Sequence, residues 1–357
     1  MFETRKIAKE TDIIRVFAKF AAITLGALFA VTPAVAQEKP ERTKVHIGVG
    51  GKTALYYLPL TITERLGYFR EQGLDVEISD FQGGSKSMQA LVGGSVDVVA
   101  GAYEHTITIQ TKGQEVQAFT ALGRYPGYAF GIAKAKAAGY KSPKDLKGMK
   151  IGVTAPGSGT QTFAEYLLKK DGLKGSDVSF IGVGASSAAA AALRAGQIDA
   201  ISNIDPVMTQ LEASGDIVII SDVRTTKGTM ETFGTPMPAA TLYTTKSFVE
   251  KNPKTVQALA NAMVKALQWL QKATPEQVAE TVPAQYHGTD RALYMASFIK
   301  IREGISPDGL FPKDGVENTL KMLRSTTAGM ESVNVRLDET YTNRFVEQAL
   351  RSSASKR

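Results

Sequence analysis

Short apolar runs alternate with helix-like segments along the first part of the chain. Strands are predicted over 44–49, 74–78 and 96–100, and helices over 58–72 and 85–92. Gly73 directly follows the first of these helices, where glycine commonly ends a helix. Strand–helix alternation of this kind is typical of α/β proteins with largely parallel sheets. We therefore expect an α/β fold from residue 44 onward.

The same pattern returns roughly a hundred residues later. The segment 90–99 (ALVGGSVDVV) is similar to 192–201 (ALRAGQIDAI), and 150–153 (KIGV) resembles 46–49 (HIGV). In each half a small, serine-bearing helix start precedes the repeated segment. A period of this length is too long for a solenoid and instead favours two similar α/β lobes.

Two apolar stretches, 127–133 and 238–243, flank the second half and are predicted to carry the chain into a second lobe and back. After Lys246 the pattern is almost wholly helical. Helices are predicted over 255–270, 277–282, 290–301, 315–324 and 339–349. By elimination they return to the first lobe. We expect lobe I over 37–130 and 244–357, lobe II over 131–243, and a cleft between them.

The N-terminal segment differs from the rest of the chain. Basic residues precede an apolar run from Phe20 to Val35, which ends in the small-residue motif Ala34-Val35-Ala36. This order is typical of a secretory signal peptide. The alternative is a membrane anchor, but the run is about 16 residues, shorter than a span needs, and Pro33 interrupts it. We expect cleavage near Ala36 and export of residues 37–357 to the periplasm as a soluble protein.

Composition removes several classes of function. The 357 residues contain no cysteine and three histidines, which excludes disulfides, cysteine-ligated metals and thiol catalysis. The net charge of +7 is dispersed rather than gathered in a patch, so nucleic-acid binding is not expected. Neither a Gly-x-Ser-x-Gly nor a His-Glu-x-x-His motif is present. We therefore expect no enzyme activity, no cofactor and no metal.

Candidate chemistry lies in the loops that follow the predicted strands, where open α/β sheets bind ligands. The segments 83–86 and 154–160 each open a helix with glycines and hydroxyls, an arrangement that suits an anion. Helix capping and solvent exposure are the alternatives. The loops 103–105 and 203–205 occupy corresponding places in the two halves and are expected to face each other. The "GKT" of 51–53 lacks the first glycine of a phosphate loop, where His46 stands.

Several segments together resemble a known family. The sequences of 65–78 (RLGYFREQGLDVEI), 83–99, 145–160 and 192–201 are similar to those of the nitrate/sulfonate/taurine class of ABC-transporter substrate-binding proteins. The resemblance implies the type II periplasmic binding protein fold, with two α/β lobes, two crossover segments and a helical C-terminal region. It also implies a monomer that captures a small organic ligand, which we expect to be anionic, and delivers it to an ABC permease in the inner membrane.

The resemblance further implies which residues contact the ligand. These are Thr53, Tyr56, Gly84, Ser85, Tyr103, Glu104, His105, Ser158, Gly159, Thr160, Asn203 and Asp205. Glu104 and Asp205 fit poorly beside nitrate or a simple sulfonate, and leave room for a larger ligand with hydrogen-bond donors. The alternatives are a periplasmic sensor module that presents its closed form to a receptor, and a secreted enzyme on the same fold. The enzymes of this superfamily use cysteines, which this chain lacks.

Overall fold

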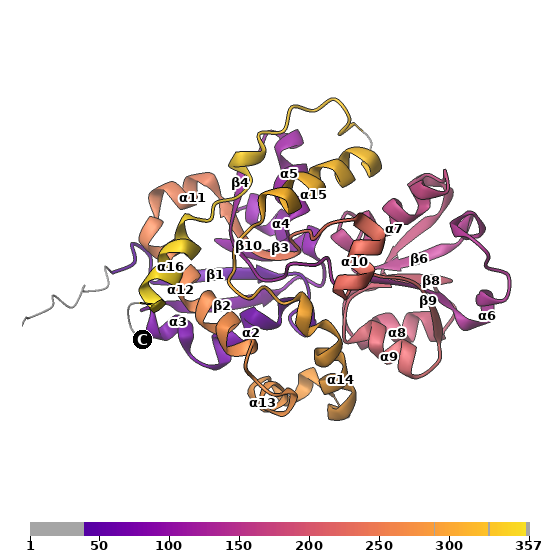
Figure 1. The fold of residues 1–357 in the computed structure, drawn as a ribbon, viewed down its shortest axis with the longest axis horizontal. Helices are drawn as coiled ribbons and strands as arrows, with labels where there is room; N and C mark the ends of the chain where they lie inside the picture. The colour runs from indigo at the N-terminus through magenta and orange to yellow at the C-terminus, as the bar shows by residue number, and fades with distance from the viewer. Residues whose placement is uncertain (1–38, 289, 328, 355–357) are drawn as a thin grey trace, which may run out of the picture. The chain divides into compact units, whose positions relative to one another are not determined.

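A computed structural model describes residues 39–288, 290–327 and 329–354. The predicted signal segment, 1–36, lies outside the described residues. Residues 39–357 form one compact unit that contains two five-stranded sheets (Figure 1). We call the parts built on the first and second sheets lobe I and lobe II. The limits predicted for the two lobes stay a prediction.

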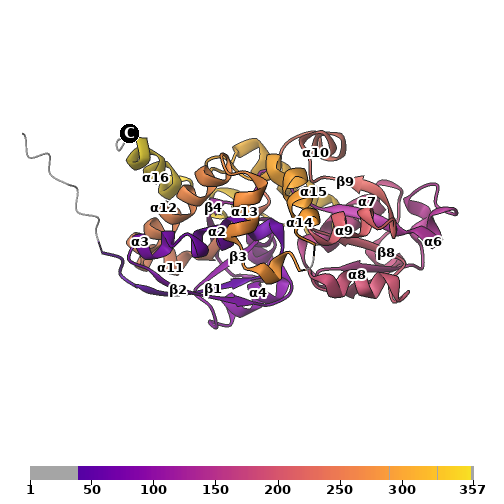
Figure 2. The ribbon, with the colours of Figure 1, turned by 90° about the horizontal axis from the view of Figure 1, so that it is seen from below.

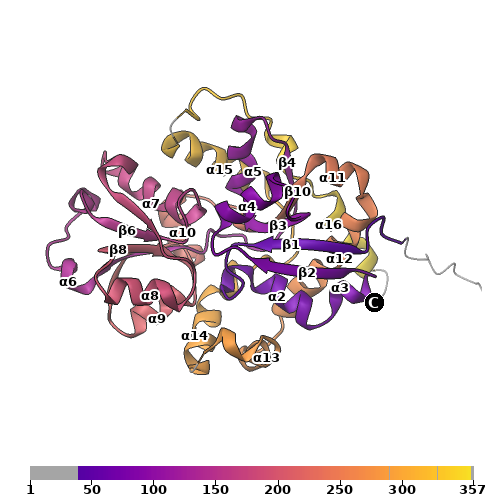
Figure 3. The same ribbon diagram turned by 180° about the vertical axis from the view of Figure 1, so that it is seen from behind.

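The first sheet has the strand order β2-β1-β3-β10-β4. Its strands are β1 Lys44–Val49, β2 Asp75–Asp80, β3 Val98–Ala102, β4 Val116–Ala121 and β10 Ala240–Thr245. β1 runs parallel to β2 and β3, as Figure 3 shows for β1 and β2, whereas β10 is antiparallel to both of its neighbours. The predicted strand 44–49 matches β1 to the residue. Alternate side chains of β1 are buried in the core, as expected for a strand whose side chains point to opposite faces in turn.

The second sheet repeats this arrangement with the order β7-β6-β8-β5-β9. Its strands are β5 Ala129–Ala133, β6 Lys150–Val153, β7 Ser179–Gly182, β8 Ala200–Asn203 and β9 Ile217–Asp222. Here β5 is the antiparallel strand beside β8 and β9. The chain thus passes between the sheets twice, from β4 to β5 and from β9 to β10. The expected α/β fold with two crossovers is confirmed.

The sequence repeat has a structural counterpart near the starts of β1 and β6. The Asp97 carboxylate accepts the backbone N–H of His46 at 2.9 Å, and the Asp199 carboxylate accepts that of Lys150 at 2.9 Å. Each aspartate therefore ties the start of β3 or β8 to the start of β1 or β6. Both aspartates are therefore structural.

Helices cover the sheets. The first helices of lobe I are α2 Leu58–Arg65, α3 Tyr68–Glu71, α4 Gly84–Val92 and α5 Glu104–Thr108. The helices of lobe II are α6 Lys134–Ala137, α7 Gly159–Lys170, α8 Ser187–Arg194, α9 Val207–Ala213 and α10 Thr226–Phe233. The C-terminal helices are α11 Lys246–Lys251, α12 Pro253–Leu270, α13 Pro275–Thr281, α14 Arg291–Ile301, α15 Lys313–Thr326 and α16 Arg344–Ala354. α12 lies over one face of the first sheet beside α2 (Figure 2), with Leu259, Met263 and Leu267 buried.

Two predicted helices differ from the structure. The helix predicted over 58–72 breaks between α2 and α3 because Gly67 adopts a left-handed conformation, with φ of 75°. The helix predicted over 339–349 begins only at Arg344. Before it, Leu337–Glu339 form a short 3-10 helix, and the backbone of Ala118 in β4 bonds to Thr340 and Thr342, which holds this segment against the sheet.

The remaining C-terminal helices match their predictions to within about three residues, the usual uncertainty of such boundaries. α15 packs against α5 of lobe I and also against α7, and α14 packs against Leu55–Tyr57 of lobe I and also against α9, so both helices contact both lobes. Within the described residues no helix is long and apolar enough to cross a membrane.

Candidate functional site

The two lobes touch through the two helix starts that the sequence singled out. The backbone N–H of Ser85, at the start of α4, donates to Ser158 Oγ at 3.2 Å, and the two hydroxyl oxygens lie 3.2 Å apart. The Ser85 hydroxyl also donates to the Pro156 carbonyl at 2.8 Å. The structure therefore brings together two residues predicted to bind the ligand, Ser85 and Ser158, which hydrogen-bond to each other.

Small residues let the lobe backbones approach closely. A Cβ on Gly83 would lie 2.5 Å from the Ala155 Cβ, and a Cβ on Gly51 would lie 3.0 Å from the Ala185 Cβ. At both positions φ is positive, a conformation that glycine adopts without strain. The glycines of these loops thus allow direct contact between the lobes. Thr53, in the turn before Leu55–Tyr57, is half-buried next to this contact.

Glu104 and His105 are the central polar residues on the lobe I side. The sequence placed them in a loop, but they begin helix α5, and both side chains are buried, with 6% and 5% exposed. They follow β3 directly, so the sheet fixes their position at its carboxyl edge. Burial raises the pKa of Glu104 from 4.5 to about 7, and burial lowers the pKa of His105 from 6.5 to about 4.

Tyrosine hydroxyls surround this pair. The Tyr128 hydroxyl donates to Glu104 Oε1 at 3.4 Å and lies 3.2 Å from the Tyr56 hydroxyl, and the Tyr56 and Tyr128 rings stack with centroids 5.6 Å apart. His105 Nδ1 lies 3.3 Å from the Tyr243 hydroxyl. Burial raises the pKa of each of these tyrosines, so all are neutral hydrogen-bonding groups. The sequence considered Tyr56 but missed Tyr128 and Tyr243, which come from distant segments.

Two predicted glycines make room for this cluster. A Cβ on Gly84, the first residue of α4, would lie 2.9 Å from His105 Cε1. A Cβ on Gly159, the first residue of α7, would overlap the Tyr128 hydroxyl and Glu104 Oε1. Gly159 belongs to lobe II and Glu104 to lobe I. The buried state of Glu104 therefore depends on the contact between the lobes.

Three other predicted residues have their side chains engaged elsewhere. The Tyr103 ring packs between Phe311 and Tyr341 in the lobe I core. Asn203 Nδ2 donates to the Gly184 carbonyl at 3.0 Å, and its Oδ1 accepts a backbone N–H. Thr160 Oγ1 accepts the backbone N–H of Thr154 at 3.0 Å. The structure does not bring these three side chains to the Glu104 cluster, and their contact with a ligand stays a prediction.

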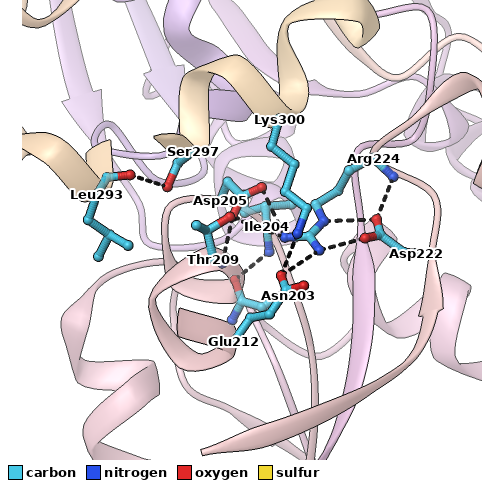
Figure 4. Close-up of polar contacts among 10 residues, drawn as sticks. All are labelled: Asn203, Ile204, Asp205, Thr209, Glu212, Asp222, Arg224, Leu293, Ser297 and Lys300. Atoms are coloured by element: carbon cyan, nitrogen blue, oxygen red, sulfur yellow. Dashed lines mark hydrogen bonds and ion pairs between the residues drawn. The ribbon is translucent and has the colours of Figure 1, made fainter. Parts of the chain in front are cut away.

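Asp205 belongs to a separate ion network around Arg224, a residue that the sequence analysis missed (Figure 4). The Arg224 guanidinium is fully buried and contacts Asp205 at 3.3 Å and Asp222 at 2.6 Å. It also contacts Glu212 at 3.1 Å, which pairs in turn with Lys300 of α14 at 2.5 Å. The charge of Asp205 is thus already compensated. The closeness of Asp222 and Arg224 in sequence is the one signal that could have indicated this network.

A cleft of about 1520 Å³ opens next to the lobe contact. It is lined by residues of α4, α5 and α7 and by parts of 326–333, and it reaches Ser85, His105, Pro156 and Gly157. His105 Nε2 has no hydrogen-bond partner in the described part of the chain. The described residues contain no cluster of three or more metal-ligating side chains. The arrangement can therefore hold a small organic molecule through hydroxyl, carboxyl, imidazole and aromatic groups.

Two similar α/β lobes with two crossovers and polar groups at the strand ends define the type II periplasmic binding protein fold. The chain resembles the alkanesulfonate-binding protein SsuA of Xanthomonas axonopodis pv. citri bound to MOPS, at 18% identity and TM-score 0.67, covering 85% of this chain and 99% of that one. It likewise resembles the periplasmic nitrate-binding protein NrtA of Synechocystis PCC 6803, at 16% identity and TM-score 0.68. That match covers 88% of this chain and 90% of NrtA. Residues 55–278 match the NMT1/THI5-like family, and the chain belongs to that family.

Two further comparisons have higher identity. A solved structure from Bordetella bronchiseptica RB50 is 52% identical, with TM-score 0.87, covering 89% of this chain and all of that one. "Putative binding protein YtlA" of Bacillus subtilis (strain 168) is 25% identical over 292 residues, or 80% of this chain and 84% of that protein.

A shorter match is to an enzyme. The 4-amino-5-hydroxymethyl-2-methylpyrimidine phosphate synthase of Schizosaccharomyces pombe is 32% identical over 158 residues, which is 44% of this chain and 43% of the enzyme. The family therefore includes both binding proteins and synthases.

Proposed function

We propose that this chain is an extracytoplasmic solute-binding protein. It captures a small organic molecule between its lobes and delivers it to an ABC permease. The observation that carries the proposal is the direct contact of the α4 and α7 starts, since Ser85 and Ser158 meet at 3.2 Å across the lobes. The fold, the match to YtlA and the likeness to the SsuA and NrtA structures support it.

The mechanism is a shift of population between open and closed forms. A ligand that contacts both lobes binds the closed form more tightly and so favours it. The polar groups at the contact, Ser85, Ser158, Glu104 and His105, are those that a ligand would meet on entering. A permease that recognises the closed form would then accept only the loaded protein. We place the protein in the periplasm as a monomer, in keeping with the periplasmic NrtA.

The test is a thermal-shift screen of the purified chain against small carboxylates, sulfonates, amines and amidines. Ligand at 100 times its dissociation constant adds about 2.7 kcal/mol of stability. Replacing Ser85 and Ser158 together with alanine removes only contacts between the lobes, so it should weaken the binding of any hit at least fivefold while the variant remains folded. An unchanged affinity in the double variant would contradict the site.

A synthase is the second candidate, favoured by the partial match to the S. pombe enzyme. That match covers 44% of this chain, whereas the match to YtlA covers 80%. Mass spectrometry of each hit after prolonged incubation with the protein separates the two functions. A binding protein returns the compound unchanged, and conversion of a hit to a new product would favour the enzyme.

A further inference from the structure

Glu104 is a buried carboxyl whose charge no other described residue compensates. Asp205, Asp222 and Glu212 each pair with Arg224, and Glu212 also pairs with Lys300. By contrast, Glu104 forms no ion pair with a lysine or arginine of the described residues and accepts a hydrogen bond from the neutral Tyr128 hydroxyl at 3.4 Å. Buried carboxylates in proteins are normally paired with a cation or strong donors. A partner of positive charge or with N–H groups would therefore stabilise the ionised form of Glu104.

The surroundings of Glu104 are aromatic and neutral. Tyr56 and Tyr128 present stacked rings, and Tyr57 meets Tyr56 edge to face with centroids 4.9 Å apart. The phenol oxygens and the unpartnered His105 Nε2 accept or donate single hydrogen bonds. Aromatic faces attract cations and stack on planar groups. This set is suited to a planar molecule with positive charge.

Glu104 also lies at the boundary that a ligand must cross. Gly159 of lobe II covers Glu104 Oε1 so closely that no Cβ fits between them. Separation of the lobes at Gly159 therefore uncovers the carboxyl. A molecule held there would contact lobe I through Glu104 and lobe II through the start of α7.

From this geometry, and resting on the proposed function, we propose that the ligand is a planar organic cation or N–H donor, such as an aromatic amidine or amine, that binds Glu104 between the lobes. Nitrate and sulfonates are disfavoured at Glu104 itself because an anion would lie against a carboxyl that forms no ion pair, whereas Lys112, Lys169 and Lys174 line the neighbouring cleft. Burial raises the pKa of Glu104 to about 7, so a bound cation would displace the proton that the carboxyl holds below neutral pH.

The test uses planar aromatic amidines and amines, each matched with the carboxylate and sulfonate on the same ring, for example benzamidine, benzoate and benzenesulfonate. We expect the cationic members to stabilise the protein and the anionic members not to. Glu104→Gln keeps the shape but removes the charge, so it should weaken the cation at least tenfold. Glu347→Gln, on the exposed surface of α16, is the matched control and should leave binding unchanged.

Calorimetry gives a second, independent readout. At pH 6, in two buffers with different ionisation enthalpies, binding of a cation to the wild type should release close to one proton. Glu104→Gln should release none. Proton uptake, or release that persists in Glu104→Gln, would overturn the proposal.

The outcomes separate this inference from the proposed function. If only carboxylates or sulfonates bind, and lose affinity in the Ser85/Ser158 double alanine variant, the ligand class is wrong and the solute-binding function stands. If no compound of either charge shifts the melting temperature, both are contradicted. Binding of a cation that Glu104→Gln leaves unchanged overturns the role of Glu104 alone.

Discussion

Glu104 and His105 are neighbours whose buried side chains should give opposite pH dependences of stability. The pKa of Glu104 rises from 4.5 to about 7, while the pKa of His105 falls from 6.5 to about 4. The direction of each effect follows from which state binds more protons. Between pH 4.5 and 6.5 the folded protein keeps the Glu104 proton and the unfolded chain loses it, so this residue makes stability fall as pH rises.

His105 acts the other way. In the same range the unfolded chain holds a proton on the imidazole and the folded protein does not, so stability rises with pH. At about 1.4 kcal/mol per pH unit and proton, and allowing for partial titration at both ends, each effect amounts to about 2 kcal/mol across this range. In the wild type the two nearly cancel. The groups facing the pair are tyrosines, whose raised pKa values keep them from titrating here.

The assay is urea unfolding at half-unit steps from pH 4.5 to 6.5, with each variant compared with the wild type. Relative to the wild type, Glu104→Gln should gain about 2 kcal/mol on going from pH 4.5 to 6.5. His105→Asn should lose about the same, and the double variant should run parallel to the wild type. Two single variants with slopes of the same sign, or both parallel to the wild type, would refute the burial of this pair.

Two further predictions concern the lobe contact and the ion network. Gly159→Ala should weaken ligand binding about 5- to 150-fold, because the added methyl group meets Glu104 Oε1 across the lobe contact, where overpacking costs about 1–3 kcal/mol. Gly139→Ala is the control, because this residue is exposed and a Cβ there would only touch the Lys136 carbonyl at 3.8 Å, so it should bind normally. If calorimetry gives Gly159→Ala the same affinity as the wild type, closure over Glu104 is contradicted. Arg224→Met should lower the free energy of unfolding by about 3–5 kcal/mol, because it leaves buried carboxylates without their cation. Lys300→Met removes a partly exposed pair and should cost under about 1 kcal/mol in the same denaturation experiment.

The sequence predicted most of the fold because its strands alternate so regularly. β1 was located to the residue, and the repeat of about a hundred residues indicated two equivalent sheets. The failures lie where long-range contacts override local pattern. Gly67 splits a helix that periodicity alone would continue, and backbone bonds to Ala118 hold the chain ahead of α16 against the sheet.

The site was predictable only in part, for a related reason. Ser85 and Ser158 were both predicted to contact the ligand because each lies at a helix start after a strand, although Ser85 follows β2 and Ser158 follows β6, the counterpart of β1. The partner of Asp205 could not be predicted, since Arg224 lies after a different strand and reaches it only in the folded chain. The environment of Glu104 also depends on Tyr128 and Tyr243, which come from the segments that connect the lobes. A single sequence does not show which distant residues come into contact in the folded chain.

The place of β10 in the first sheet has a consequence for biosynthesis. This strand lies between β3 and β4, yet it is made after the whole of the second sheet (Figure 1). The strands of the second sheet follow one another along the chain without interruption, so that sheet can form as soon as β9 has left the ribosome. The first sheet must wait, with the facing edges of β3 and β4 unpaired, until Thr245 emerges. The half of the protein that is synthesised first is therefore completed last.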